Sequence, residues 1–326
     1  MGVSKKVALA ILVVVLAGAI GVGAYLLIMG RAPFMPEVLW VKHEWGTITA
    51  DLTEIRTTIA IRNPNPVSAR LKGISYTIYL NGLKFATGST AEEVEIPANG
   101  VAEVRLSTFI NNSMIPPCWV SHIKHGEHTK AKVVGSATVE VLGVTFTLPF
   151  ERRYEFRSNL TEIMSTDEPR EVELLRIDAQ RIYIIIKSIH TSWGEVTDTW
   201  TQAIHRVVVE NPNDVPLTVK SVDYVLVATW EDYGPIHLAR GSQPLDVIIG
   251  PGEEAELTLT TYLNNTALKD WWIGHITHNE TTTLTIRVYA TFDFETPFGH
   301  HTINVLVYEE TIDIRTRLLE RFAITP

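Results

Sequence analysis

The sequence predicts an all-β chain in which two tandem antiparallel β-sandwiches follow one transmembrane α-helix. Three observations lead to this fold class. Apolar and polar residues alternate in short runs separated by turn signals, which is the pattern of half-buried strands. Most of these runs occur twice at constant spacing, and an uncharged stretch precedes them. The predicted parts are a cytoplasmic N-terminus (1–6), a transmembrane helix (7–29), a first sandwich (33–157), a linker (158–180) with a short helix or an entering strand as the alternative at its end, a second sandwich (181–315) and a C-terminal tail (316–326).

The uncharged stretch runs from Val7 to Met29. As a helix it would be about 35 Å long, enough to cross the hydrocarbon layer of a bilayer. Lys5 and Lys6 precede it, so the positive-inside rule predicts a cytoplasmic N-terminus and an extracytoplasmic remainder. We therefore expect a single-pass protein of the cell membrane that contacts the lipid bilayer through residues 7–29. A cleaved signal peptide is the alternative, because small residues cluster at 17–19.

The rest of the chain is an internal duplication. The run "WGTITADLTEIRTTIAIRNPN" starts at Trp45, and "WGEVTDTWTQAIHRVVVENPN" starts at Trp193, an offset of 148. Further on, "IPANGVAEVRLSTFINNS" from Ile96 matches "IGPGEEAELTLTTYLNNT" from Ile249 at an offset of 153. Chance rarely keeps tryptophan and Asn-Pro-Asn in one register, so the matches indicate two copies of one module. The five extra residues of the second copy fall in one loop.

Each copy offers about seven short strands with turn signals between them, which favours an antiparallel sandwich. In the first copy Ile74, Tyr76 and Ile78 alternate with polar residues, and Asn81–Gly82 follows as a hairpin turn. One helix per copy is expected near residues 116–125 and 268–278.

The Asn-Pro-Asn runs are Asn63–Pro64–Asn65 and Asn211–Pro212–Asn213. Proline has no N–H to donate, so a strand ladder cannot continue through it. Asparagine amides can bond the backbone groups that lose their ladder partners. We interpret both runs as strand terminators that satisfy their own hydrogen bonds, with a ligand-binding role as the alternative.

At these residues the sequence resembles the type 2 late embryogenesis abundant family, also called the WHy domain. The shared pattern is an alternating strand, Asn-Pro-Asn, a strand with a central tyrosine, a hairpin, a glycine and further alternating strands. It covers about 38–157 and 184–315, and it is present twice. The resemblance implies a sandwich like those of immunoglobulin and fibronectin type III domains. It also implies a non-enzymatic role in protection against desiccation and other stress.

Charge and composition exclude several functions. The chain carries 28 Lys and Arg against 37 Asp and Glu, a net charge of −9. An acidic surface repels phosphate backbones, so no nucleic-acid partner is expected. The single cysteine, Cys118, allows no internal disulfide and no cysteine-based zinc site.

Catalytic and metal motifs are weak or absent. The sequence has no His-Glu-x-x-His, Gly-x-Ser-x-Gly, Walker loop or Cys-x-x-Cys, so we predict no enzyme and no cofactor. His122 and His125 have a spacing that can place two zinc ligands on one side of a helix, and they are the candidate metal residues. The alternative is a structural pair that caps a short helix, since His275 and His278 repeat it.

The loop from Trp230 to His237 is the candidate contact for a protein partner at the cell surface. The equivalent segment of the first copy is a two-residue turn. The longer loop carries Trp230, Tyr233 and Ile236. Aromatic residues on surface loops are favoured anchors for binding. Four Asn-x-Ser/Thr sequons are candidate glycosylation sites: Asn111, Asn159, Asn264 and Asn279.

The leading functional expectation is protection of the cell surface against desiccation or stress by a stable, hydrated scaffold. The alternative is an adhesion or assembly module that binds a partner through the 230–237 loop or an exposed edge strand. The sequence does not give the oligomeric state.

Overall fold

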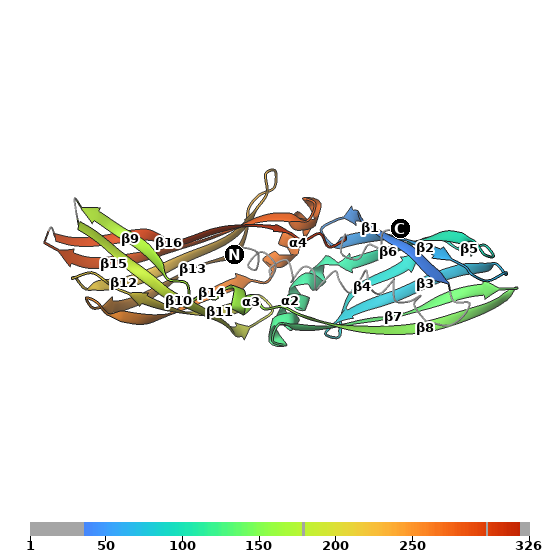
Figure 1. The fold of residues 1–326 in the computed structure, drawn as a ribbon, viewed down its shortest axis with the longest axis horizontal. Coiled ribbons are helices and arrows are strands. Elements are labelled where there is room, and N and C mark those ends of the chain that lie inside the picture. Colours follow the sequence, from blue (N-terminus) through green and yellow to red (C-terminus); the bar gives the residue numbers. More distant parts are fainter. Residues whose placement is uncertain (1–35, 178–179, 298, 320–326) are drawn as a thin grey trace. The chain divides into compact units, whose positions relative to one another are not determined.

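The structure is a computed structural model, and it describes residues 36–177, 180–297 and 299–319. Its strands form two compact units, each with its own sheet and core. The N-repeat unit comprises described residues 36–158, 272–281 and 315–319. The C-repeat unit comprises described residues 159–177, 180–271, 282–297 and 299–314. The all-β part of the predicted fold class is confirmed (Figure 1).

The sheet of the N-repeat unit is antiparallel, with the order β1-β2-β6-β4-β3-β7-β8, and β5 also pairs with β3. The polypeptide leaves β6 through a short helical segment before it re-enters the sheet at β7. The elements are β1 (Glu37–Ile48), β2 (Leu52–Arg62), β3 (Ala69–Leu80), β4 (Leu83–Thr90), β5 (Val94–Ile96), β6 (Val101–Asn111), η1 (Asn112–Met114), α2 (Ile115–Lys124), β7 (His128–Val141) and β8 (Val144–Arg157).

The sheet of the C-repeat unit has the order β16-β15-β12-β13-β14-β11-β10-β9. β13 and β14 pair only at Ala239 and Leu263, so the strands on either side of this junction form two layers of four. The elements are α3 (Leu160–Ile163), β9 (Arg170–Ile177), β10 (Gln180–Val196), β11 (Trp200–Glu210), β12 (Leu217–Thr229), β13 (Ile236–Ile249), β14 (Glu254–Asn264), α4 (Ala267–Thr277), β15 (Thr281–Thr296) and β16 (Gly299–Arg315).

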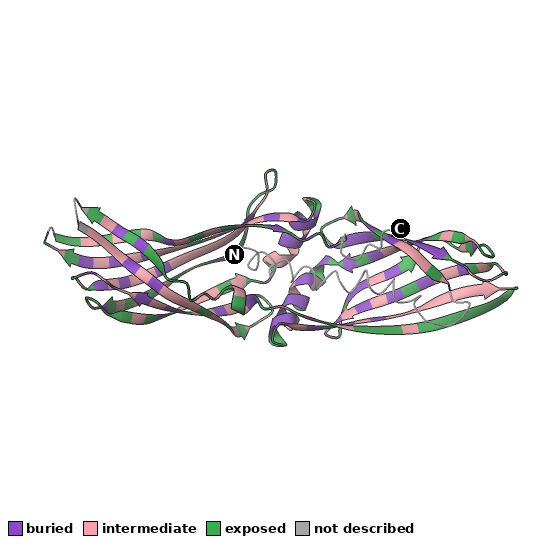
Figure 2. Ribbon diagram, viewed as in Figure 1, coloured by how far each residue is buried: buried purple, intermediate pink, exposed green. Residues whose placement is uncertain are grey.

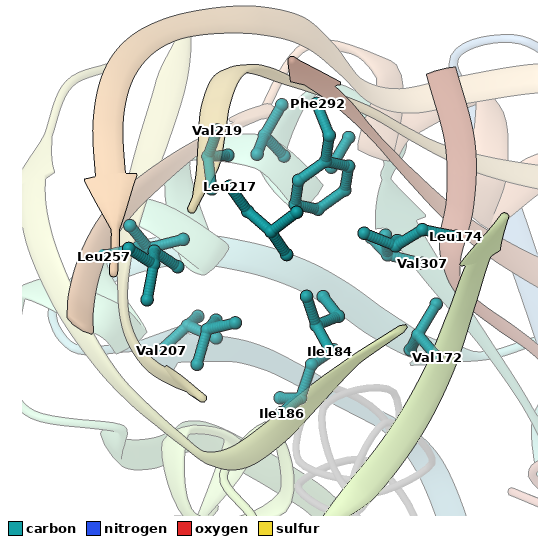
Figure 3. Close-up of a cluster of buried hydrophobic side chains, with 14 of the residues drawn as sticks. Val172, Leu174, Ile184, Ile186, Val207, Leu217, Val219, Leu257, Phe292 and Val307 are labelled. Carbon is teal, nitrogen blue, oxygen red and sulfur yellow. The ribbon is translucent and has the colours of Figure 1, made fainter. Parts of the chain in front are cut away.

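The strand periodicity explains where the cores lie. In β3 the alternating residues Ile74, Tyr76 and Ile78 are buried, as the period of two predicts. In the C-repeat unit, apolar side chains from both layers point into one cluster (Figure 3). The labelled members are Val172, Leu174, Ile184, Ile186, Val207, Leu217, Val219, Leu257, Phe292 and Val307.

A tyrosine and a glycine face each other across neighbouring strands in both units. Tyr76 on β3 is paired with Gly88 on β4, and Tyr224 on β12 with Gly241 on β13. A Cβ added at Gly88 would lie 2.1 Å from the ring carbon Cζ of Tyr76. The glycine is therefore required because the aromatic ring lies flat over its backbone, an arrangement that stabilises glycine within a strand.

The N-repeat unit includes a tryptophan from far along the chain. Trp272 is 0% exposed, and its indole Nε1–H donates to Thr53 Oγ1 at 3.0 Å. Its ring meets that of Trp45 edge to face, with ring centroids 6.2 Å apart. Trp45 Nε1–H in turn donates to Glu280 Oε1 at 3.0 Å. Burial of these large rings explains why residues 272–281 belong to this unit.

β8 is an edge strand, and it is exposed along most of its length (Figure 2). Open edges invite pairing with other chains, and charged residues and proline discourage it. β8 carries Pro149, and Glu151, Arg153 and Glu155 alternate along it. This composition is suited to an edge that does not pair further.

The predicted transmembrane helix is the part of the fold class that is wrong. Among residues 36–177, 180–297 and 299–319, no helix is long and apolar enough to cross a membrane. Residues 7–29, on which the prediction rested, lie outside the described residues.

The segment 158–180, predicted as a linker, contains α3 and β9, and β9 pairs with β10. Its acidic composition concealed a strand in which Val172 and Leu174 are buried while Glu171 and Glu173 point outward. The charges lie on the solvent face of an edge strand, so the composition of the segment hid most of the strand.

Candidate functional site

The first Asn-Pro-Asn run ends β2 and is held by its own amides. Asn63 is only 3% exposed. Its Nδ2 donates to the carbonyl oxygens of Val67 at 2.8 Å, Pro97 at 3.2 Å and Ile96 at 3.4 Å. Its Oδ1 accepts from the backbone N–H of Asn65 at 3.0 Å and from Asn65 Nδ2 at 2.9 Å.

The second run repeats this geometry after β11. Asn211 Nδ2 donates to the carbonyl oxygens of Val215 at 2.8 Å, Ile249 at 2.9 Å and Gly250 at 3.1 Å. Its Oδ1 accepts from the backbone N–H and from Nδ2 of Asn213 at 3.1 and 2.7 Å. Every polar atom of the buried amide is used within the turn, so these runs tie three chain segments together and leave nothing to offer a ligand.

The two candidate metal residues lie in different environments. His122 is buried, whereas His125 is exposed and its Nδ1 bonds the carbonyl oxygen of Ser121 at 2.6 Å. In the part of the chain that the structure describes, no group of three or more His, Cys, Asp or Glu is placed to hold a metal ion.

His122 instead links α2 to β7 and to the end of β8. Its Nδ1 lies 2.8 Å from Thr129 Oγ1, and its Nε2 lies 2.8 Å from Ser158 Oγ. The Ser158 hydroxyl donates to Glu127 Oε2 at 2.7 Å, so it must accept from His122 Nε2–H. Burial lowers the pKa of His122 to about 4, so the ring is neutral at physiological pH and its Nδ1 accepts from the Thr129 hydroxyl.

The second copy builds an equivalent network. His275 Nε2 lies 3.0 Å from Thr316 Oγ1, and the Thr316 hydroxyl donates to Glu280 Oε2 at 2.8 Å. Burial lowers the pKa of His275 to about 3. His122 and His275 therefore occupy equivalent positions in the two copies, each bonded to a hydroxyl that a glutamate accepts from.

The remaining predicted site residues lie at the surface. Tyr233 is 41% exposed, and its ring meets that of Trp230 edge to face with centroids 5.4 Å apart. Ile236 is half-buried at the start of β13. The four sequon asparagines are all exposed: Asn111, Asn159, Asn264 and Asn279. Two of them also cap turns, since Asn111 and Asn264 accept from the N–H two residues on.

The C-repeat unit contains a cavity that none of these motifs indicates. It lies between the two layers, has a volume of about 280 Å³ and is lined largely by aliphatic side chains. Ile184, Ile186 and Val207 lie on one side, and Val219 and Phe292 on the other (Figure 3).

Its size distinguishes this cavity from an ordinary packing defect. At about 24 cal/mol per Å³, a dry void of this volume would cost roughly 7 kcal/mol. That is within the range of the whole net stability of a domain, about 5–15 kcal/mol. Water fills such space poorly unless it finds two to four polar partners. Apolar walls therefore favour an apolar occupant.

An open seam between β13 and β14 borders the cavity. In the N-repeat unit the equivalent strands, β4 and β6, pair from Ala86 to Thr90. In the C-repeat unit a side chain replaces the missing ladder: Gln243 Oε1 accepts from Thr260 N–H at 2.8 Å, and its Nε2 donates to Thr258 O at 2.9 Å. A side chain can swing away far more easily than a strand, so this seam is a natural entrance.

The segment 163–166 borders the cavity on another side. The Thr191 hydroxyl donates to the carbonyl oxygen of Met164 at 2.9 Å and also lies 2.9 Å from His205 Nδ1. His205 Nε2 lies 3.0 Å from Thr261 Oγ1. Burial lowers the pKa of His205, so the ring is neutral at physiological pH, with Nδ1–H donating and Nε2 accepting.

The aligned repeats differ at several of the positions that line the cavity. Five lining positions on β11 and β12 carry smaller side chains than their counterparts in the first copy, whereas lining positions on β14 and β15 carry some larger ones. The smaller residues are Ala203 for Ile55, Val207 for Ile59, Val209 for Ile61, Val219 for Leu71 and Val222 for Ile74, and the larger ones include Leu257 for Val104 and Phe292 for Val139. Other lining positions carry larger side chains, such as His205 for Thr57 on β11 itself and Val288 for Gly135 on β15, so the two copies distribute their side-chain volume differently. Aligning the two copies residue by residue reveals these differences from the sequence alone.

Together these features define a duplicated β-sandwich protein. The sequence profile of the late embryogenesis abundant protein family matches residues 58–153 and 206–307, which is more than half of the chain. The chain therefore belongs to the late embryogenesis abundant protein family, and both repeats carry the family module.

Solved structures similar to this chain include a crystal structure from Archaeoglobus fulgidus, with 33% identity over 38% of this chain and 99% of that chain, and a TM-score of 0.34. The solution structure of an Arabidopsis thaliana protein is 12% identical over 40% of this chain and 88% of that chain, with a TM-score of 0.26. That of a late embryogenesis abundant protein is 14% identical over 46% of this chain and 74% of that chain, with a TM-score of 0.25. No curated protein matches this chain.

Proposed function

We propose that this protein protects other cellular components during desiccation or related stress, and that it does so without catalysis. The family match over both repeats carries the proposal. The assignment to the WHy domain, the extracytoplasmic location and the bilayer contact through residues 7–29 stay predictions from the sequence.

The geometry supports a stable scaffold rather than a reactive centre. The buried amides of Asn63 and Asn211 and the buried rings of His122 and His275 are satisfied by neighbouring groups. Fully satisfied buried polar networks make a fold rigid and specific. An acidic surface keeps such a scaffold hydrated and soluble.

Protection can be measured directly. The full chain is dried and rehydrated together with a desiccation-sensitive enzyme, and the activity that the enzyme retains is measured. We expect more retained activity than with an equal mass of an unrelated acidic β-sandwich protein. Equal losses with both proteins would contradict the proposal.

The 230–237 loop supports a second candidate, an assembly module. Tyr233 is exposed and stacks edge to face on Trp230, a pre-ordered aromatic pair of the kind that anchors interfaces. If the loop mediates self-assembly, the full chain should sediment as an oligomer. Trp230→Ser with Tyr233→Ser should then shift it to the monomer and leave protection of the dried enzyme unchanged. Sedimentation as a monomer at every concentration would eliminate this candidate.

A further inference from the structure

We propose that the C-repeat unit binds a neutral single-chain lipid, an alkyl or isoprenoid chain with an uncharged hydroxyl head group, in the cavity between its two layers. The inference is independent of the protective role, since it rests on the cavity alone. Three observations support it: the lining of the cavity, the charge at its border, and a tyrosine hydroxyl whose threonine partner in the first copy bonds a histidine in the second.

The walls select an apolar chain. Aliphatic side chains from both layers surround the 280 Å³ space, with Ile186 and Val207 on one side and Val219 and Phe292 on the other. Pockets that bury small apolar ligands have this character: mostly apolar walls with a few polar groups that fix orientation. The space lies between two facing layers, which suits a narrow chain.

The charges select a neutral head group. Glu310 is the one residue with a full charge among the described residues that line the cavity, and the Tyr308 hydroxyl donates to it. No lysine or arginine of the described chain lines the space. A carboxylate or phosphate would therefore meet a like charge and no counter-ion, which disfavours a fatty acid or a phospholipid head group within the cavity.

The hydroxyl of Tyr224 favours a ligand with an alcohol group. In the N-repeat unit the Tyr76 hydroxyl lies 2.6 Å from Thr108 Oγ1. In the C-repeat unit the aligned Thr261 bonds His205 instead, at 3.0 Å. The Tyr224 hydroxyl accepts from Tyr262 N–H at 3.1 Å at a solvent-exposed position of the seam, where a ligand hydroxyl can replace water as the acceptor of its proton. This proton can be donated to a hydroxyl oxygen of a ligand.

The seam supplies a route. Gln243 closes the gap between β13 and β14 with two side-chain hydrogen bonds, where the N-repeat unit has a strand ladder. The cavity is partly open to solvent, and rotation of this side chain would widen its opening without breaking a backbone ladder. The N-repeat unit has neither the open seam nor the smaller side chains, so we expect one site in the chain.

The first test uses dodecanol as the probe and the full chain as the protein. Calorimetric titration should give one binding site per chain. Ala203→Ile, which restores the residue of the first copy, should lower the affinity at least about tenfold because it fills part of the cavity. A conservative change at the aligned position of the N-repeat unit, Ile55→Val, should leave binding unchanged. Thermal unfolding of Ala203→Ile checks that this variant folds.

The second test addresses the head group. Tyr224→Phe should weaken dodecanol binding several-fold, and the matched variant Tyr76→Phe should not. Dodecanoate should bind the unmodified protein at least about tenfold more weakly than dodecanol. Absence of dodecanol binding would overturn the proposal. So would several equivalents bound with no effect of Ala203→Ile, which would indicate adsorption at the surface, and so would an equal affinity for dodecanoate.

Discussion

Asn63→Asp is expected to lower the free energy of unfolding of the N-repeat unit by about 3–5 kcal/mol. The change is nearly isosteric, so packing around the residue is preserved. It replaces the Nδ2 donor, which bonds the carbonyls of Val67, Ile96 and Pro97, by an oxygen acceptor. A carboxylate oxygen would then face the three carbonyl oxygens in a buried turn. The buried carboxylate would also have no cation beside it. Chemical denaturation followed by tryptophan fluorescence measures the loss.

The control for this variant is Asn99→Asp. Asn99 is exposed in the same unit, with φ near +50°, a region that aspartate tolerates almost as well as asparagine. Only its backbone N–H bonds the turn, to Asn65 O at 2.9 Å, and the substitution leaves that bond intact. A loss below about 0.5 kcal/mol is expected, as for most surface substitutions. Equal losses for Asn63→Asp and Asn99→Asp would show that the buried amide does not hold the turn together.

The free energy of unfolding of the N-repeat unit is also expected to fall steeply as the pH falls from about 6.5 to about 4. Burial lowers the pKa of His122 from 6.5 to about 4, partly opposed by Glu127 and aided by His128 and His125. Burial lowers the pKa of His275 to about 3, partly opposed by its hydrogen bond to the backbone of Thr281.

The direction of this pH dependence follows from the number of protons that the folded and unfolded chains bind. Below pH 6.5 the unfolded chain binds protons at these histidines while the folded chain does not, so acid favours unfolding. The full stability is present above pH 6.5, and the histidine contribution is lost by about pH 4 for His122. A shift of this size corresponds to roughly 3 kcal/mol for His122 alone. Below this window Glu54 adds a further loss: its hydrogen bond from the backbone N–H of Thr47, helped by Ser107 and Arg56, lowers its pKa from 4.5 to about 2.

His122→Gln separates this effect from general acid denaturation. The amide does not titrate, so the variant should be less stable at neutral pH but lose less stability between about pH 6.5 and pH 4. His125→Gln, one turn further along and exposed, should keep the unmodified pH dependence. Denaturant titrations across this pH range measure how steeply the free energy of unfolding of each variant falls with pH. A slope unchanged by His122→Gln would mean that acid unfolds the unit through other groups.

Much of the fold was readable from the sequence because its signals are local. Period-two alternation marked β3, and proline at Pro64 and Pro212 marked where β2 and β11 end. The linker prediction rested on the composition of the segment rather than on its alternating pattern. Residues 158–180 are acidic, yet Val172 and Leu174 alternate with the charges and form β9.

The site was less predictable because it depends on contacts across layers. The spacing of His122 and His125 is compatible with a shared ligand, but burial of one ring and exposure of the other decide otherwise. The cavity depends on what faces Ala203 and Val207 from the opposite layer, which no single strand reveals. Only the comparison of Ala203 with Ile55, and of His205 with Thr57, contained a hint of it.

The smaller side chains of the second copy also have an evolutionary consequence. Selection removes mutations that carry a domain below its stability threshold, so a lone module rarely keeps several trimmed core residues at once. After a gene duplication, one copy can keep the stability of the module while the other copy is free to change. The aligned positions Ile59 and Val207 show such a divergence between two copies within one polypeptide.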